Sequence, residues 1–411
     1  MPSPLSRQLG LLRRAGSFRL LFLATLGSGI GTWMATIALT VDIKARTDST
    51  WWVSALFIVT LLPSVVVGLA AGPLVDRLSR KRLVVAADLV RLGVFVALPF
   101  VGSAAEILAL AAVAGIANSL FRPAVLAGVP NLVSDGELSH GTALLQATDW
   151  AAATLGPILG GVLTSVSSPH LVYWINAATF AYSAILLLRI PARLLQSEQA
   201  ISRGHWRDLA EGLTVFRGSA ALITVVVAFG FAMLASGLIN VSEIFLAERA
   251  LHRGPFGYGL LWSASGLGLV VGSLYSGSLL ENRDVTSIYP LVFLPWAAGV
   301  LGAGIAPNIW VAASAVVLAG FGNGLAFPIT VLIIQRYTVD RLRGRAFTLI
   351  ISAHNALLGI SMASAGALTG LAGARWTYGI AAGFLATASV TALVLSRGLT
   401  TRTLLARQQA V

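Results

Sequence analysis

The chain has 411 residues, of which 56% are hydrophobic and 11% are charged. A soluble domain carries about 25% charged residues, so this composition excludes a soluble enzyme and predicts a chain that is embedded in a membrane over most of its length. The chain has no cysteine, which excludes disulfides, thiolate metal sites, iron–sulfur clusters and cysteine nucleophiles. Its formal net charge is +12. In a membrane protein, the distribution of basic residues between the two sides of the membrane indicates the orientation of the chain.

Twelve apolar segments, separated by short polar turns, run through the chain. Each is close to or above the roughly 20 residues that a helix needs to cross about 30 Å of hydrocarbon. The segments cover residues 18–42, 50–75, 83–102, 106–133, 141–165, 169–190, 218–247, 257–280, 288–305, 308–335, 345–371 and 375–396. The sequence therefore predicts an all-α membrane protein with twelve transmembrane helices.

The basic residues indicate an orientation. If the N-terminus is cytoplasmic, most of the 28 Lys and Arg residues fall in segments on the cytoplasmic side. Because basic residues prefer that side of a membrane, we expect a multi-pass protein of the bacterial cytoplasmic (inner) membrane with both termini in the cytoplasm. This arrangement places most of the positive charge at anionic lipid headgroups, so the charge gives no reason to expect a nucleic acid partner.

The longest polar stretch, residues 191–217, divides the chain near its middle. It is typical of a linker followed by a short amphipathic helix at the cytoplasmic interface, and a solvated linker is the alternative. We expect five regions, namely a cytoplasmic N-terminus (1–17), a six-helix bundle (18–190), the linker (191–217), a second six-helix bundle (218–396) and a cytoplasmic tail (397–411).

The two halves of the chain match at one constant offset, close to half its length. Matching pairs are Gly115 and Gly320, Asn118 and Asn323, Pro123 and Pro328, Asp135 and Asp340, and Gly161 and Gly366. A single match means little in a chain with 42 glycines, but a shared offset over separated regions indicates a duplication. Two sets of six spans inserted the same way up are the repeat pattern of one large transporter architecture.

A loop motif between the second and third segments carries a family resemblance. Residues 72–82 read GPLVDRLSRKR, which resembles the G-x-L-x-D-R-x-x-R-K-R loop of the major facilitator superfamily. The resemblance implies two pseudo-symmetric six-helix bundles that transport by alternating access. It also implies a conformational latch between the halves, formed by Gly72, Asp76, Arg77 and Arg80. The alternative is an ordinary basic cytoplasmic loop.

Shorter motifs resemble one branch of this family. Gly156, Pro157, Gly160 and Gly161 fall in a G-P-x-x-G-G sequence that is similar to a signature of exporters, where proline bends the helix and glycines permit close packing. Generic packing of small residues is the alternative. Residues 121–124 (FRPA) and 210–213 (AEGL) resemble the branch that contains the bacterial enterobactin exporter and tetracycline- and aminoglycoside-type multidrug efflux pumps.

Ionisable side chains inside spans are functional candidates, because they are costly in hydrocarbon. Arg122 in the fourth span and Asp149 in the fifth lie at comparable depths, ~12–16 Å above the cytoplasmic end at 1.5 Å per residue. We expect them to form a buried pair near the central cavity. Protonation of Asp149 would release Arg122 and favour another packing of the halves. A static structural ion pair is the alternative.

Other ionisable residues are secondary candidates for proton coupling. His354 matches Asp149 in the repeat and could titrate near neutral pH, or simply donate a hydrogen bond to a neighbouring helix. Glu243 and Asp42 lie near the outer face and could receive protons or attract cationic substrates, although snorkelling to the interface also explains Asp42. Asp88 and Arg91, three residues apart on the third span, predict an intrahelical pair that braces the Asp76 loop.

The spans also carry aromatic and amide residues that could line a substrate cavity. The candidates are Trp33, Met34, Trp150, Phe231, Asn240, Asn323 and Asn355. A mixed lining of this kind suits amphiphilic organic molecules of a few hundred daltons. The alternative for each aromatic is a position facing lipid or a packing interface.

These patterns together predict a transporter and not an enzyme. The chain has no phosphate-binding G-x-x-x-x-G-K-[ST] loop and no convincing metal-ligand spacing, so we expect no cofactor. We expect a monomeric, proton-coupled exporter (antiporter) of drugs or other amphiphilic small molecules. Export of a siderophore or lipid-like metabolite is the alternative, followed by a non-transporting membrane receptor or assembly protein.

Overall fold

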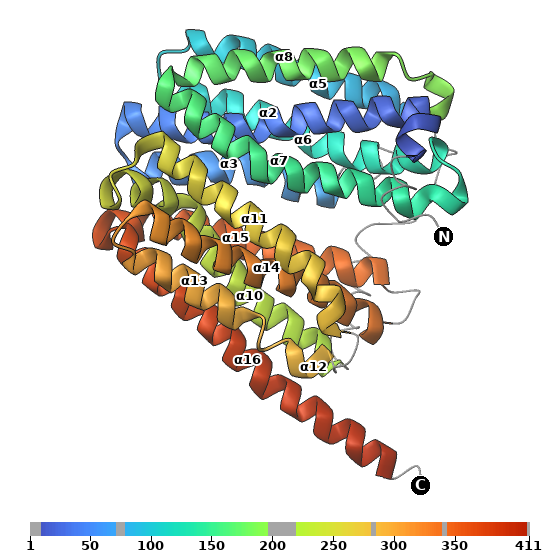
Figure 1. The fold of residues 1–411 in the computed structure, drawn as a ribbon, viewed down its shortest axis with the longest axis vertical. Coiled ribbons are helices and arrows are strands. Elements are labelled where there is room, and N and C mark those ends of the chain that lie inside the picture. Colours follow the sequence, from blue (N-terminus) through green and yellow to red (C-terminus); the bar gives the residue numbers. More distant parts are fainter. Residues whose placement is uncertain (1–9, 71–78, 196–218, 281–284, 339–342, 409–411) are drawn as a thin grey trace. The chain divides into compact units, whose positions relative to one another are not determined.

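The computed structural model describes residues 10–70, 79–195, 219–280, 285–338 and 343–408 (Figure 1). Within these ranges every regular element is a helix. In hydrocarbon no water is present to hydrogen-bond the backbone, so a continuous helix satisfies its polar groups from within. The described turns between the helices are short, as the closely spaced apolar segments of the sequence predict.

The first half of the chain forms six long helices. They are α2 (Gly16–Thr47), α3 (Thr50–Ala70), α5 (Arg80–Ala97), α6 (Ala104–Gly128), α7 (Leu138–Val166) and α8 (Pro169–Leu188). Short 3-10 turns follow α5, α6 and α8, at Leu98–Phe100, Val129–Asn131 and Ala192–Leu195, and another precedes α7 at Asp135–Glu137. Ser103 begins α6 with a capping box, in which its side chain and that of Glu106 each accept the other's backbone N–H.

The second half adds another six long helices and one short one. They are α10 (Ala220–Phe245), α11 (Gly254–Leu280), α12 (Val285–Ile288), α13 (Phe293–Ile305), α14 (Ile309–Tyr337), α15 (Arg343–Ala372) and α16 (Ala374–Gln408). A π-helical turn, Leu246–Ala250, follows α10.

Each of the twelve apolar segments of the sequence coincides with one of the long helices. Nine helices in the described ranges are long and apolar enough to cross a membrane, and residues 50–66 and 293–305 form shorter apolar helices. The ninth segment differs from its prediction, because α13 begins at Phe293 and not near residue 288. Pro290 explains the break, since proline lacks a backbone N–H and disfavours helix in the residue before it.

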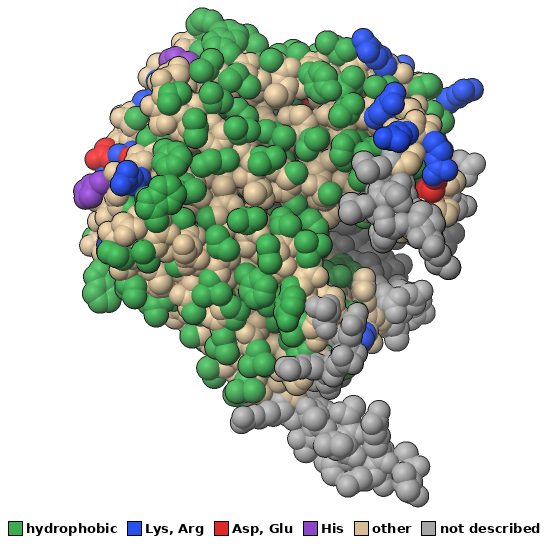
Figure 2. Space-filling model, in the orientation of Figure 1, with side chains coloured by type: hydrophobic (Ala, Val, Ile, Leu, Met, Phe, Trp, Pro, Cys, Tyr) green, Lys and Arg blue, Asp and Glu red, His purple; other side chains and the backbone are tan. Residues whose placement is uncertain are grey.

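The last helix extends beyond its apolar segment. Helix α16 continues through residues 397–408 of the expected cytoplasmic tail, to Gln408. Figure 2 shows hydrophobic side chains spread over the face in view, with Lys and Arg side chains gathered at helix ends. Many large apolar side chains are exposed on the helices, as expected of a surface that faces lipid.

The helices group into two compact units. Unit 1 comprises Met1–Asp48, Ala55–Ser202 and Gly254–Ser263, and unit 2 comprises Ser49–Ser54, Arg203–Arg253 and Ala264–Val411. In unit 1, α2 packs against α7 and α8, while α5 packs against α6 and α8. In unit 2, α10 packs against α15 and α16, while α13 packs against α14 and α16.

Glycines of α7 allow its close approach to α2. A Cβ atom placed on Gly160 would lie 2.6 Å from the carbonyl oxygen of Met34 and 2.9 Å from its Cα. A Cβ on Gly156 would lie 2.9 Å from the carbonyl oxygen of Ile30. Both neighbours are backbone atoms, which cannot move aside as a flexible side chain can. The G-P-x-x-G-G sequence is therefore where the two helices touch through their backbones.

We predict that Gly160→Ala destabilises the protein, because the new methyl group overlaps the backbone of α2. Overpacking of this kind costs about 1–3 kcal/mol. The matched control is Gly93→Ala on α5, where an added Cβ meets nothing within 4 Å. The melting temperature of the purified protein in detergent should fall for Gly160→Ala and stay level or rise for Gly93→Ala. Equal melting temperatures for the two variants would contradict the backbone contact.

Candidate functional site

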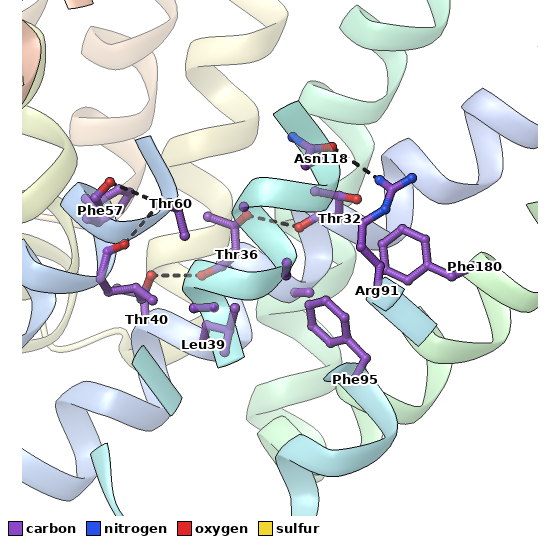
Figure 3. Close-up of a pocket in the computed structure, with 15 residues that line it drawn as sticks. Thr32, Thr36, Leu39, Thr40, Phe57, Thr60, Arg91, Phe95, Asn118 and Phe180 are labelled. Carbon is purple, nitrogen blue, oxygen red and sulfur yellow. Dashed lines mark hydrogen bonds between the residues drawn. The ribbon is translucent and has the colours of Figure 1, made fainter. Parts of the chain in front are cut away.

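Two adjoining cavities lie inside unit 1. Cavity 1, of about 170 Å³, lies among α2, α3, α5, α6 and α8 (Figure 3). Cavity 2, of about 290 Å³, lies among α2, α5, α6 and α7. Thr32, Thr36, Arg91 and Asn118 line both cavities. The two spaces therefore share a polar wall.

A group of polar side chains includes part of that wall, and three of its four members, Asp88, Arg91 and Ser183, are buried. We call Asp88, Arg91, Asn118 and Ser183 the Asp88 cluster. Nη2 of Arg91 donates to Oδ1 of Asp88 at 2.5 Å, and Oγ of Ser183 donates to Oδ2 of Asp88 at 2.6 Å. Nη1 of Arg91 donates to Oδ1 of Asn118 at 3.2 Å. The cluster ties α5 to α6 and α8.

Two aromatic rings hold the Arg91 guanidinium. Its central carbon lies 4.3 Å from the ring centroid of Phe121 and 4.4 Å from that of Phe180. The residue is 3% exposed and its partner Asp88 is 0% exposed. A buried charge needs a partner and hydrogen bonds, and both carboxylate oxygens of Asp88 have them. The pair predicted from sequence is present, but its contacts reach α6 and α8. Asp76, whose loop it was expected to brace, lies outside the described residues.

Hydroxyl groups form the α2 side of the shared wall. Thr32, Thr36 and Thr40 are four residues apart and so lie on one face of the helix; we call them the α2 hydroxyl stripe. Thr32 donates to the carbonyl oxygen of Ser28 at 2.7 Å, Thr36 to that of Thr32 at 3.0 Å, and Thr40 to that of Thr36 at 2.8 Å (Figure 3). Polar groups on this face remain hydrogen-bonded without any partner from another helix.

Arg122 and Asp149 meet in cavity 2. Nη1 of Arg122 lies 2.6 Å from Oδ1 of Asp149, which joins α6 to α7. The sequence analysis expected a buried pair, and that expectation was wrong, because the two side chains are 54% and 37% exposed. Both residues line cavity 2. Their depth along the helices could be read from the sequence, whereas the open space beside them could not.

Asp42 lies in a closed network near the end of α2. It accepts a hydrogen bond from Nε of Arg46 at 2.7 Å and from the Tyr173 hydroxyl at 2.9 Å. Arg46 also donates to the carbonyl oxygens of Val101 and Gly102. These bonds connect α2 to α8 and to the turn before α6.

The two proton-coupling candidates of unit 2 are both buried. His354 on α15 is 5% exposed, its ring centroid lies 5.0 Å from that of Phe229 on α10, and it has a hydrogen bond to the backbone of Val226. Nε2 of His354 has no hydrogen-bond partner among the described residues. Glu243 is 4% exposed and lies near the end of α10.

The proposed latch is only partly visible, because Gly72, Asp76 and Arg77 lie outside the described residues. Nη1 of Arg80 donates to the carbonyl oxygen of Ala127 at 2.7 Å. Lys81 donates to the carbonyl oxygens of Leu188 and Ile190, both at 2.7 Å. The basic run therefore caps the C-terminal ends of α6 and α8, where carbonyl groups lack helical partners and carry partial negative charge.

Of the substrate-cavity candidates, Trp33 lines cavity 2, and its ring centroid lies 5.4 Å from that of Trp262 within unit 1. The others are not among the residues that line cavities 1 and 2, namely Met34, Trp150, Phe231, Asn240, Asn323 and Asn355. Phe231 stacks on Phe384 at 6.2 Å. Across the described ranges, no three His, Asp or Glu side chains gather as metal ligands would.

The sequence analysis missed the α2 hydroxyl stripe and Asn118 as parts of the site. The spacing of Thr32, Thr36 and Thr40 was a usable signal, because hydroxyl residues four apart mark one polar face of an otherwise apolar helix. Asn118 was noted only as a repeat position. Its contact with Arg91 required knowing that α5 and α6 pack side by side.

Comparison with known proteins decides the family. The family model described as Major Facilitator Superfamily matches residues 21–283 and 225–409. The chain belongs to the major facilitator superfamily. An uncharacterised transporter of this superfamily from Bacillus subtilis is 26% identical over 375 residues, covering 87% of this chain and 86% of its own.

Two relatives with more specific names are exporters. The enterobactin exporter of Citrobacter koseri is 32% identical over 286 residues, covering 67% of this chain and 66% of its own. The multidrug efflux pump Tap of Mycobacterium tuberculosis is 26% identical over 380 residues, covering 89% of this chain and 90% of its own. The motif resemblance to this branch agrees with both similarities.

Solved structures show the same fold. A mutant of a nucleoside transporter aligns over 92% of this chain and 99% of its own, with a TM-score of 0.75 and 13% identity. A bacterial homologue of the iron transporter ferroportin, in an inward-facing state, aligns over 92% and 98% of the two chains, with a TM-score of 0.71 and 13% identity. At this identity the likeness establishes the fold alone, an all-helical membrane transporter fold.

We predict that Arg91→Leu strongly destabilises the protein, because it leaves the Asp88 carboxylate buried without its cation. Breaking a buried pair from one side costs about 3–5 kcal/mol. The double variant Asp88→Leu with Arg91→Leu should lose less stability than Arg91→Leu alone, since no charge then remains buried. Melting temperature and folded yield in detergent measure both effects.

The control for this prediction is Arg14→Leu. Arg14 pairs with Glu137 at 3.2 Å, and the side chains are 72% and 34% exposed. An exposed pair contributes about 0–1 kcal/mol, so this variant should melt close to the parent protein. A parental melting temperature for Arg91→Leu would contradict the role given to the Asp88 cluster.

Proposed function

We propose that this protein is a proton-coupled exporter that moves amphiphilic small molecules across the bacterial cytoplasmic membrane by alternating access. The observation that carries the proposal is the Arg122–Asp149 ion pair on the wall of cavity 2. An ion pair that is accessible from a cavity can exchange a proton, which a fully enclosed pair cannot do readily. Similarity to a multidrug efflux pump and an enterobactin exporter supports the direction of transport.

The proposed coupling step is the protonation of Asp149. The neutral acid attracts Arg122 less strongly, so the pair opens and the balance between two packings of the protein shifts. Glu243, His354 and Asp42 remain proposed as further protonation sites. Asp42 is the most constrained of the three, because Arg46 and Tyr173 both occupy its carboxylate.

The remaining organisation is proposed with this function. Residues 18–190 and 218–396 act as two bundles, joined by the linker 191–217, with both termini in the cytoplasm. Gly72, Asp76, Arg77 and Arg80 act as the latch between them, and the capping bond of Arg80 to Ala127 anchors one end of that loop. The protein works as a monomer, and its reaction is transport and not catalysis.

A second candidate function is export of a siderophore or a lipid-like metabolite. The observation in its favour is the 32% identity to the enterobactin exporter of Citrobacter koseri. A panel of catecholate siderophores and cationic dyes, tested by thermal shift on the purified protein, separates the two functions. Stabilisation by the siderophores alone would favour this second candidate.

We predict that Asp149→Asn abolishes the dependence of efflux on a proton gradient, because the amide mimics the protonated acid permanently. Efflux of an amphiphilic dye from energised membrane vesicles should fall to the rate seen when the gradient is collapsed. Binding of the dye to the purified variant, measured by thermal shift, should persist.

Glu137→Gln is the matched control for this experiment. It makes the same carboxylate-to-amide change in an exposed pair with Arg14 and lines neither cavity, so gradient-driven efflux should be unchanged. Gradient-driven efflux that survives in Asp149→Asn would eliminate Asp149 as the coupling residue. A parent protein that exports no compound of the panel would eliminate the exporter itself.

A further inference from the structure

A groove at the surface of unit 1 lies where α5 begins and α8 ends. Its volume is about 600 Å³, and the 3-10 turn that follows α8 contributes to its wall. We call it the α5–α8 groove. It is lined by Ser79, Lys81, Arg82, Val85, Ala86, Leu89, Leu188 and Ala192. None of these residues lines cavity 1 or cavity 2, so the groove is separate from the site described above.

Three polar residues at the start of α5, Ser79, Lys81 and Arg82, line one end of the groove, and we call them the polar rim. Nζ of Lys81 is held at the end of α8 by hydrogen bonds of 2.7 Å to the carbonyl oxygens of Leu188 and Ile190. An ammonium group has three N–H bonds, so one remains for a ligand. Ser79 precedes the first residue of α5, and its side chain makes no capping hydrogen bond. The rim therefore offers donors at a fixed place.

The positive charge of the rim is not neutralised by a carboxylate within the described ranges. None of the ion pairs between described residues includes Lys81, Arg82 or the neighbouring Arg189. Arg14 of the same unit, in contrast, pairs with Glu137. Arg82 and Arg189 are exposed, and Figure 2 shows Lys and Arg side chains gathered where α8 ends. The open end of the groove thus carries positive charge that an anion can approach.

The remaining five lining residues are apolar. Val85 and Leu89 follow Arg82 at spacings of three and four residues, so the three share one face of α5. Leu89 lies ~10 Å along the helix from Arg82 at 1.5 Å per residue. Leu89 is 51% exposed, and Leu188 on α8 is 55% exposed. The groove therefore joins a cationic end to exposed apolar surface, as a ligand with an anionic head and a hydrocarbon tail requires.

The repeated architecture does not require the cations of the rim. At the offset that relates the two halves, Lys81 and Arg82 correspond to Thr286 and Ser287, whereas Leu188 corresponds to Leu393. The apolar side is thus common to both halves, and the two cations are particular to the first. Packing of the bundle alone does not account for them.

We propose that the α5–α8 groove binds an anionic phospholipid. The lipid phosphate accepts hydrogen bonds from the polar rim, where the guanidinium of Arg82 can offer two parallel N–H groups to two phosphate oxygens. One acyl chain lies along Leu89 and Leu188. Basic pockets between transmembrane helices bind anionic lipid headgroups in this way. A zwitterionic phospholipid brings a cationic group to a cationic rim, so the groove discriminates against it. This inference does not depend on which molecule the protein exports.

The test compares phosphatidylglycerol with phosphatidylcholine of identical acyl chains. Each lipid is titrated into the purified full-length protein in detergent, and bound lipid is counted by native mass spectrometry. We expect the first phosphatidylglycerol to bind about tenfold more tightly than the first phosphatidylcholine, because hydrogen bonds between charged groups are strong. Equal affinities for the two lipids would overturn the proposal.

Substitution of Arg82 locates the headgroup. Arg82→Gln should weaken phosphatidylglycerol binding about fivefold, since each basic residue near an anionic lipid contributes roughly that factor. Its affinity for phosphatidylcholine should not fall, and Arg82→Lys, which keeps the charge, should retain a preference for phosphatidylglycerol. Arg336→Gln is the matched control, because it removes the same charge from the exposed last turn of α14, away from the groove lining. An unchanged phosphatidylglycerol affinity in Arg82→Gln, or an equal loss in Arg336→Gln, would contradict the site.

A second pair of measurements separates a lipid from a dissolved anion. Excess inorganic phosphate, added at matched ionic strength, should not displace phosphatidylglycerol. Leu89→Asn places an amide on the apolar wall at an exposed position, so it should weaken phosphatidylglycerol binding and leave the melting temperature in detergent unchanged. Displacement by phosphate, or full phosphatidylglycerol affinity in Leu89→Asn, would assign the rim to a dissolved anion and overturn the lipid site.

Discussion

The structure depends on one constraint, which is that polar groups within hydrocarbon must be satisfied inside the protein. Continuous helices meet this constraint for the backbone and account for the run of long helices in the described ranges. The α2 hydroxyl stripe meets it in the same way, because Thr32, Thr36 and Thr40 each bond to a carbonyl oxygen one turn earlier. In the wall that both cavities share, Thr32 and Thr36 therefore keep hydroxyl lone pairs as acceptors, while Arg91 and Asn118 carry N–H groups.

Two different interactions hold the helices that enclose the cavities. Close backbone contact at Gly156 and Gly160 fixes α7 against α2. The Asp88 cluster instead fixes α5 against α6 and α8 through hydrogen bonds to a buried ion pair. The glycine contacts between α7 and α2 depend on dispersion forces, which act over any well-packed surface. The Asp88 cluster depends on hydrogen bonds between particular side chains. The cluster therefore determines where the Arg91 guanidinium lies relative to both cavities.

The fold could be predicted from the sequence because span length and apolarity are local properties. The break before α13 was missed, since it depends on Pro290 within an apolar run. Arg122 and Asp149 could be placed at one depth by counting residues, but their exposure could not, because it depends on the empty space of cavity 2. The bond from Ser183 to Asp88 joins helices far apart in the chain, and no spacing in the sequence indicates it.

The difference between the two halves shows which polar residues the architecture needs. At the repeat offset, Asp88, Arg91 and Ser183 correspond to Phe293, Trp296 and Ala388, all buried apolar residues. The second half thus packs the same positions without charge. A buried ion pair is often no more stabilising than apolar residues of similar volume, so stability alone does not explain the pair. A duplicated bundle has no packing reason to keep Asp88 and Arg91. The position of Arg91 supplies a reason, because Arg91 lines both cavities and Arg122 and Asp149 line cavity 2, so that three charged residues of unit 1 meet the same internal space.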